Sequence, residues 1–334
     1  MSTSPKVSIL VPIYGVEKYI ERCAISLFEQ SYDNIEYIFV NDCTKDKSID
    51  ILKSVIAHYP NRRDAVKIIK HECNRGLAAA RNTAVAAATG DFVMHVDSDD
   101  WLETTAVEQC VLKQRVTDAD IVTMDAKVWW PKYIAYYKTP EFSSPDVLLK
   151  EMLRRHVIWN VWGRLIRRSL YSDYNIKTIE GCNMGEDAQV MIPLVCYSGK
   201  VTSVCEVLYN YDSTIVSSYS ATFSVKKFSQ VWQTIDHIYA FISANKPSML
   251  DEAKSLVAIT AADQLKDVAL CKDAEEYHIC MAHIERQLQL TEKKHWKAVP
   301  FFNRIMLVIH NRHCLYWYMT IASCIKQRIN VLLQ

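Results

Sequence analysis

Carboxylates stand at three notable places in the chain, two of them after apolar runs. The segment DSDD at 97–100 follows the run 92–96, Asp42 follows the run 35–40, and two acids stand at 186–187. Like charges held close together raise one another's pKa and cost free energy unless a cation compensates them. Hard carboxylate oxygens suit Mg²⁺ or Mn²⁺, which often complete their shells with phosphate and water. The pattern predicts either solvated turns or a site for a divalent cation and a diphosphate.

The first hundred residues alternate strand and helix patterns. The expected strands lie at 7–11, 35–40, 66–69 and 92–96, and the expected helices lie at 17–30, 47–58 and 77–88. This alternation predicts a parallel α/β sheet. Ligands of such sheets bind outside the carboxyl ends of the strands. We therefore expect the acids that follow the strands to share one edge, without an equal number of cations beside them.

The DSDD segment also has a purely structural interpretation. Asp99 or Asp100 could cap a helix that begins at Glu103, since aspartate is a favoured N-cap. The strand-end position, with Asp42 at a second strand end, favours the ligand site. Asp42 by itself is a common turn residue.

Two further residues each have two interpretations. Asp187 follows Gly185 in an expected loop, where an exposed and mobile carboxylate can act as a base. It could also cap a helix that begins at Ala188. Arg81 lies on the Ala-rich expected helix and could bind a phosphate or pair with an acid.

Composition excludes several classes of protein. None of the seven glycines forms G-x-G-x-x-G or a Walker loop, so the common glycine-built nucleotide sites are absent from the sequence. Lys and Arg total 39 against 38 Asp and Glu, which argues against a nucleic-acid binder. Residues 293–334 contain seven Lys or Arg and no acid, together with aromatic residues. This basic segment predicts either contact with an anionic membrane surface or a helix packed on its own domain.

Cysteine usage and hydropathy predict the compartment. Eleven cysteines occur without any C-x-x-C pair, which is typical of a reduced, cytoplasmic protein. The longest uncharged stretch near the end, 314–325, is too short to span a bilayer. We expect a cytoplasmic protein with no transmembrane segment, and peripheral contact of 293–334 with the inner face of the membrane.

Four segments in order resemble the family 2 glycosyltransferases with a GT-A fold. They are VSILVPIYGVEKYIERC, YIFVNDCTKD, NRGLAAARN and ATGDFVMHVDSDDW, with weaker similarity in GEDAQVMIPL and LYNYDSTIVSSYS. The ordered set is far more specific than any one segment. The resemblance implies an α/β, Rossmann-like, mostly parallel sheet flanked by helices at 1–220. A C-terminal helical region is expected at 221–334.

The resemblance also implies a chemistry. It is the inverting transfer of a sugar from a nucleotide diphosphate sugar, expected to be a UDP-sugar, to a hydroxyl of a glycan or lipid-linked acceptor. By the motif match, Asp97 lies near the ribose and Asp99 holds Mn²⁺ or Mg²⁺. Asp187 matches the general base and Asp42 the acid that recognises the nucleotide base.

The remaining matched positions surround the nucleotide. Pro12 and Tyr14 line its pocket, Asn74 and Arg81 lie near the nucleotide or phosphates, and Ser98 is the middle residue of the D-x-D motif. The chain has Gly15 where the family often has Asn, and NDCT at 41–44 where it often has DDGS. Two rival functions remain from the sequence: a non-catalytic sugar-nucleotide-binding subunit, and a nucleotidyltransferase. The latter would need a basic, glycine-rich start that 9–18 lacks.

Overall fold

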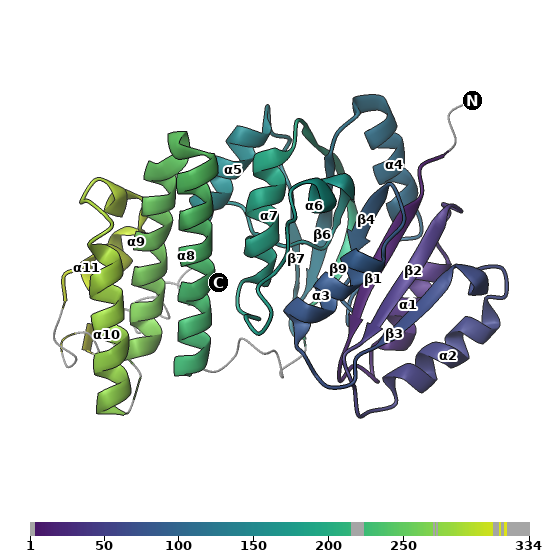
Figure 1. The fold of residues 1–334 in the computed structure, drawn as a ribbon, viewed down its shortest axis with the longest axis horizontal. Coiled ribbons are helices and arrows are strands. Elements are labelled where there is room, and N and C mark those ends of the chain that lie inside the picture. Colours follow the sequence, from purple (N-terminus) through teal and green to yellow (C-terminus); the bar gives the residue numbers. More distant parts are fainter. Residues whose placement is uncertain are drawn as a thin grey trace. The chain divides into compact units, whose positions relative to one another are not determined.

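The computed structural model describes residues 4–214, 224–269, 271, 273–309, 314, 317 and 318. The chain divides into two compact units, each with its own interior. The first unit comprises residues 1–149 and 158–218, and the second comprises 150–157 and 219–334. Figure 1 shows a sheet flanked by helices in the first unit and a group of helices in the second.

The first half of the first unit alternates strands and helices as the sequence predicts. Its elements are β1 (Val7–Ile13), α1 (Ile20–Phe28), β2 (Ile35–Asn41), α2 (Ser48–His58), β3 (Val66–Lys70), α3 (Leu77–Ala87) and β4 (Phe92–His95). The strands β3, β2, β1 and β4 lie side by side in that order and are all parallel. Their carboxyl ends therefore share one edge of the sheet.

The second half of this unit extends the sheet with mixed pairing. Its elements are β5 (Trp101–Leu102), α4 (Ala106–Thr117), β6 (Ile121–Trp129), β7 (Ile134–Tyr137), β8 (Arg164–Arg167), α6 (Ser169–Asp173), α7 (Glu186–Tyr197) and β9 (Val201–Asp212). The order continues from β4 through β8, β6 and β9 to β5, with β7 paired to β6. Strand β8 is antiparallel to β4, whereas β6 and β9 are parallel.

The two faces of the sheet bury different side chains because successive strand residues point in opposite directions. Val7, Ile9 and Val11 of β1 belong to one apolar cluster together with the buried faces of α1 and α4. Helix α3 packs on β1 and β2, and its small side chains permit a close approach. Every residue of β1 is buried, as expected for a strand covered on both faces.

The second unit is helical. It contains α8 (Val225–Asn245), α9 (Leu250–Ala269), α10 (Ala274–Leu288) and α11 (Phe301–Met306), while α5 (Pro145–Leu153) spans the division between the units. Ser224 and Asp273 cap α8 and α10 by accepting hydrogen bonds from backbone N–H groups of the first turn. Among the described residues, no helix combines the length and the apolar character needed to cross a bilayer.

Candidate active site

A single buried cation connects the acids of two motifs. The Nη2 atom of Arg81, on α3, lies 3.0 Å from Oδ1 of Asp97 and 3.4 Å from Oδ1 of Asp187. Glu186 Oε1 lies 3.8 Å from the same nitrogen. Arg81 is 3% exposed, so these attractions act with little solvent screening. Arg81 thus pairs with acids and not with a phosphate in this structure, and this one cation faces three acids, in line with the expected shortage of cations beside them.

Asp187 lies on a helix and not in a mobile loop. Helix α7 begins at Glu186 and not at Ala188, and Gly185 at φ 77° is its N-cap. The Asp187 side chain is 21% exposed, and its Oδ2 accepts a hydrogen bond from Val161 N at 3.2 Å. Burial raises the pKa of Asp187, and the charge of Arg81 opposes that rise. The expectations of an exposed loop and of an N-cap are therefore both wrong, and the carboxylate is held in a defined direction.

Unlike Asp97, which pairs with Arg81, Asp99 forms no ion pair through its carboxylate with any described residue. Burial, followed by the negative charge of Asp97, raises the pKa of Asp99 to about 6. The nearby Arg22 is directed elsewhere: its Nη2 donates to the backbone carbonyl of Asp99 at 2.8 Å and pairs with Asp212 at 2.7 Å. A half-buried carboxylate without a cation is a suitable oxygen ligand for a divalent metal ion.

The carboxylates of the DSDD segment fit a metal ion that is bound jointly by the protein and by the phosphates of a substrate. Across the described ranges, no group of three or more His, Cys, Asp or Glu side chains could hold an ion by itself. Oδ1 of Asp97 is buried and has no well-directed hydrogen bond, although it lies near Arg81. Magnesium is usually held by one or two carboxylates together with substrate phosphates. Asp99, with Asp97 beside it, fits that mode of binding.

Asp100 has a structural role that the sequence did not predict. It is 1% exposed, and its two oxygens accept hydrogen bonds from the Tyr209 hydroxyl at 2.7 Å and from Asp212 N at 2.8 Å. The segment leads into the short strand β5, and α4 begins only at Ala106 after Thr105. The expected helix cap at DSDD is therefore wrong. The segment LYNYD, which resembles the family, contains Tyr209 and Asp212. Its sequence does not indicate that both residues form hydrogen bonds with Asp100.

Asp42 organises the loop that leads into α3. Its carboxylate accepts hydrogen bonds from His71 Nδ1 at 2.7 Å, from Arg75 N at 2.8 Å and from Gly76 N at 2.7 Å. Gly76 has φ 88°, and a Cβ atom there would lie 2.5 Å from the side chain of Asn183. The turn therefore requires glycine. Recognition of a nucleotide base by Asp42 stays a prediction.

The other predicted site residues lie at or near the same sheet edge. Pro12 is buried in β1, Tyr14 just beyond β1 is 52% exposed, and Ser98 is 6% exposed. Asn74 is exposed in the loop that Asp42 holds. The structure thus joins Asp97, Asp187 and Arg81 directly through ion pairs. The other predicted site residues lie near the carboxyl ends of the parallel strands without joining these ion pairs.

The sequence profile described as Glycosyl transferase family 2 matches residues 8–177, which is about half of the chain. The chain belongs to this family. Curated relatives agree: the uncharacterized glycosyltransferase EpsJ of Bacillus subtilis is 31% identical over 214 residues, 62% of this chain and 61% of the relative. Glycosyltransferase GlyA of Streptococcus pneumoniae is 39% identical over 223 residues, 63% of this chain and 31% of the relative.

Solved structures show the same fold. S. aureus TarS residues 1–349 in complex with UDP-GlcNAc superposes with a TM-score of 0.73 at 18% identity, over 96% of this chain and 92% of that one. A mannosyltransferase from Pyrobaculum calidifontis in complex with GDP-Man and Mn²⁺ gives a TM-score of 0.51 at 15% identity, over 92% and 86%.

The predicted glycosyltransferase family and its α/β fold with C-terminal helices are confirmed. The chain matches about six tenths of EpsJ and less than a third of GlyA.

Proposed function

We propose that this family member is an inverting glycosyltransferase. It moves a sugar from a UDP-sugar to a hydroxyl of a glycan or lipid-linked acceptor. The observation that carries the proposal is the constellation of Asp97, Arg81 and Asp187, with the unpaired Asp99 beside it. Three separate stretches of the chain supply these groups at the carboxyl edge of a parallel sheet, where ligands of such sheets bind. The TarS complex with UDP-GlcNAc supports the choice of a UDP-sugar.

Asp187 is the general base of the proposed reaction. The acceptor hydroxyl attacks the anomeric carbon of the donor, its proton passes to the Asp187 carboxylate, and the bond to the diphosphate breaks. A single displacement of this kind inverts the anomeric centre. The hydrogen bond from Val161 N and the nearby guanidinium of Arg81 hold the base in one orientation. A positioned base typically contributes about 10²–10⁴-fold to the rate.

Asp99 is the proposed metal ligand, with Asp97 directed toward the ribose. A bound Mn²⁺ or Mg²⁺ would supply Lewis-acid stabilisation of the charge on the departing diphosphate. The buried Arg81 pairs with Asp97 and Asp187 and holds both carboxylates in place before any substrate arrives. Asp42 orders the loop 74–76 at the same edge, where the nucleotide is expected.

A panel of UDP-, GDP- and other nucleotide sugars tests the donor assignment. Binding to the native state raises its thermal stability, so the correct donor should raise the melting temperature in the presence of Mn²⁺. The same donor should then be hydrolysed, or transferred to an acceptor, in a metal-dependent reaction. Stabilisation without turnover would favour a non-catalytic sugar-nucleotide-binding subunit. Stabilisation only by nucleoside triphosphates would favour a nucleotidyltransferase.

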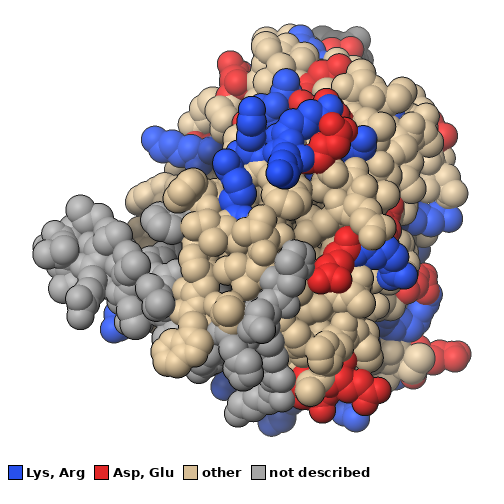
Figure 2. Space-filling model, turned by 90° about the vertical axis from the view of Figure 1, so that its left-hand side faces the viewer, with Lys and Arg blue, Asp and Glu red and all other residues tan. Residues whose placement is uncertain are grey.

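We also propose peripheral contact of the helical unit with an anionic membrane surface. Figure 2 shows Lys and Arg side chains gathered on one face of the molecule, with a few acids beside them. Lys293 and Lys297 are exposed and form no ion pair with a described residue. Phe301, at the start of α11, is 68% exposed, whereas Met306 in the same helix is buried. Much of 310–334 lies outside the described residues.

Vesicle flotation tests this contact. The chain should float with vesicles that contain anionic lipid and remain at the bottom with neutral vesicles, because the attraction is electrostatic. The double variant Lys293→Gln, Lys297→Gln should reduce recovery. Lys53→Gln and Lys200→Gln, introduced together at exposed positions of the first unit, are the matched control. Equal flotation of both double variants would reject these lysines as the membrane contact.

A further inference from the structure

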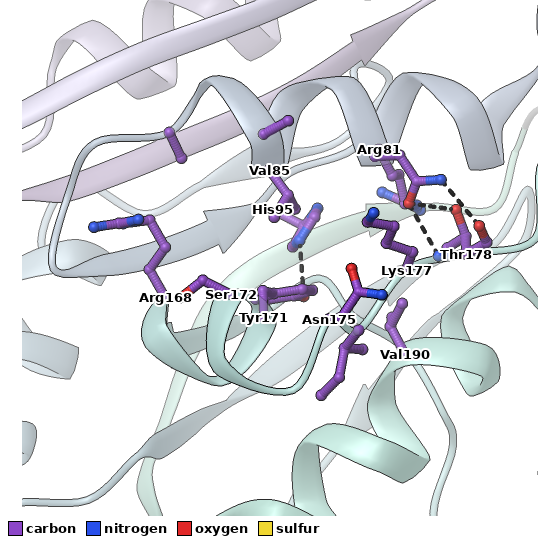
Figure 3. A pocket seen from close by; sticks show the side chains of 14 residues that line it. Arg81, Val85, His95, Arg168, Tyr171, Ser172, Asn175, Lys177, Thr178 and Val190 are labelled. Atoms are coloured by element: carbon purple, nitrogen blue, oxygen red, sulfur yellow. Dashed lines mark hydrogen bonds between the residues drawn. The ribbon is translucent and has the colours of Figure 1, made fainter. Parts of the chain in front are cut away.

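A cavity of about 210 Å³ lies beside α3 in the first unit. Figure 3 shows residues of α3, β4, α6 and the segment before α7 around it. Arg81 is the one residue that it shares with the predicted site positions; Pro12, Tyr14, Asp42 and Asp99 do not line it. The cavity is therefore distinct from the sheet edge at which the donor is expected.

Part of the cavity wall is apolar. Val85, Ala86 and Ala88 contribute from α3 and the residue after it, and Ile176 and Val190 contribute from the opposite side. An apolar cavity of roughly 150 Å³ is large enough to hold benzene. The present cavity can therefore hold a body of that size and a small polar group attached to it.

The charged part of the wall is entirely basic. Arg81, Arg168 and Lys177 line the cavity, and no Asp or Glu does. Lys177 is exposed and forms no ion pair with a described residue. Arg168 uses Nε to donate to the carbonyl of Gly90. The acids that pair with Arg81 all approach its Nη2 atom. The lining is thus suited to a negative group.

Buried polar atoms in this wall lack partners. Nε and Nη1 of Arg81, and Nδ1 of His95, are buried without a hydrogen-bond partner among the described residues. Arg81 is 3% exposed and His95 is 2% exposed. His95 uses its other nitrogen, Nε2, in a 3.1 Å hydrogen bond with the Tyr171 hydroxyl. Buried donors without partners cost free energy, which a ligand bearing acceptor oxygens would recover.

We propose that this cavity binds a small organic anion, a phosphate or carboxylate carried on a compact apolar body. The apolar body lies against Val85 and Val190, and the anionic group faces Lys177 and the unpartnered donors of Arg81, with Nδ1 of His95 nearby. In Figure 3 these side chains surround one space, with Tyr171 and Asn175 completing its polar side. This ligand is distinct from the sugar donor and from the acceptor.

Calorimetric titration of the full chain with phenyl phosphate and with benzoate tests the proposal. Two matched probes each lack one part of the ligand. Phenol has the aromatic ring without the anionic group, and inorganic phosphate has the anionic group without the ring. We expect at least one organic anion to bind in the micromolar to millimolar range and at least tenfold more tightly than either matched probe. The two anions separate a phosphate site from a carboxylate site. Failure of both to bind would overturn the proposal.

Two variants locate the binding. Val85→Phe fills the apolar end and should weaken binding of the anion at least tenfold, with retention of the fold checked by circular dichroism. Lys177→Gln, at an exposed position, should weaken it severalfold, while Lys200→Gln outside the cavity should leave it unchanged. Saturating UDP should not displace the anion. Displacement by UDP, or unchanged affinity in both cavity variants, would place the anion elsewhere and overturn the proposal.

Discussion

The guanidinium of Arg81 lies 3.4 Å from the carboxylate of Asp187, which joins the second turn of α3 to the first turn of α7 through one buried ion pair. The same nitrogen lies 3.0 Å from Asp97 at the end of β4. One enclosed cation therefore sets the spacing between the D-x-D segment and the proposed base. Without that cation the two carboxylates would repel each other in a poorly solvated site.

Arg81→Met should destabilise the fold and abolish turnover. Methionine has a similar length but no charge, so it leaves Asp97 and Asp187 buried and uncompensated. Breaking a buried ion pair from one side typically costs about 3–5 kcal/mol of unfolding free energy. Urea denaturation measures this loss. Arg75→Met is the control, because the pair of Arg75 with Glu180 is exposed and should matter little. Equal stability of the two variants would contradict the central role of Arg81.

Asp99→Ala should abolish metal-dependent turnover without lowering stability. Its carboxylate forms no ion pair with a described residue, and burial already disfavours its charged form. The neighbouring Asp100→Ala should instead lower the unfolding free energy by about 1–3 kcal/mol, because it leaves the Tyr209 hydroxyl and Asp212 N–H without an acceptor. Turnover and urea denaturation of both variants separate the two roles. Wild-type turnover in Asp99→Ala would remove it from the mechanism.

Asp187→Asn should keep donor binding and lose transfer. The amide cannot accept the acceptor's proton, so the turnover number should fall by about 10²–10⁴-fold while the dissociation constant of the donor changes little. Calorimetry with the donor and a steady-state transfer assay measure the two quantities. Glu186→Gln is the matched control on the preceding residue, which lies farther from Arg81, at 3.8 Å, and should keep most of the activity. If Asp187→Asn were as fast as the wild type, the base would lie elsewhere.

The sequence predicts the strands and helices of the first hundred residues closely. Their apolar residues follow the simple patterns of strands covered on both faces and of helices with one buried face. Val7–Ile13 is apolar except for Ser8 and becomes a strand buried on both faces, and the helical spacing of 47–58 becomes α2 with a shift of one residue. Since parallel strands end at one edge, the placement of Asp42 and the DSDD segment followed from the expected parallel arrangement of the strands.

The partners of those acids could not be predicted from local patterns. Arg81 and Asp187 are remote in the chain, and helix spacing gives no sign that their side chains meet. Asp100 accepts hydrogen bonds from Tyr209 and Asp212 of a distant strand. The sequence of that strand resembled the family but gave no sign of these contacts. The N-cap interpretations failed because Thr105 and Gly185, not the acids, precede the helices α4 and α7.

Glu36 should make stability depend on pH below about 4.5. Burial would raise its pKa, but hydrogen bonds from Lys6, Ser8 and Thr89 outweigh burial and lower the pKa from 4.5 to about 2. Because the folded pKa is depressed, the carboxylate stabilises the fold fully above 4.5. That contribution, on the order of 2 kcal/mol after allowance for screening, is lost as pH falls from about 4.5 toward 2.

Glu36→Gln isolates this contribution. The variant should unfold more easily than the wild type at pH 7, and the difference in unfolding free energy should shrink steadily between pH 5 and pH 3. Asp50→Asn, at an exposed position in the first turn of α2, controls for the loss of a surface carboxylate. A difference that stayed constant with pH would show that Glu36 acts through its shape and not through its charge. The physical reason for expecting the decline is that the hydrogen bonds of Lys6, Ser8 and Thr89 favour only the ionised form.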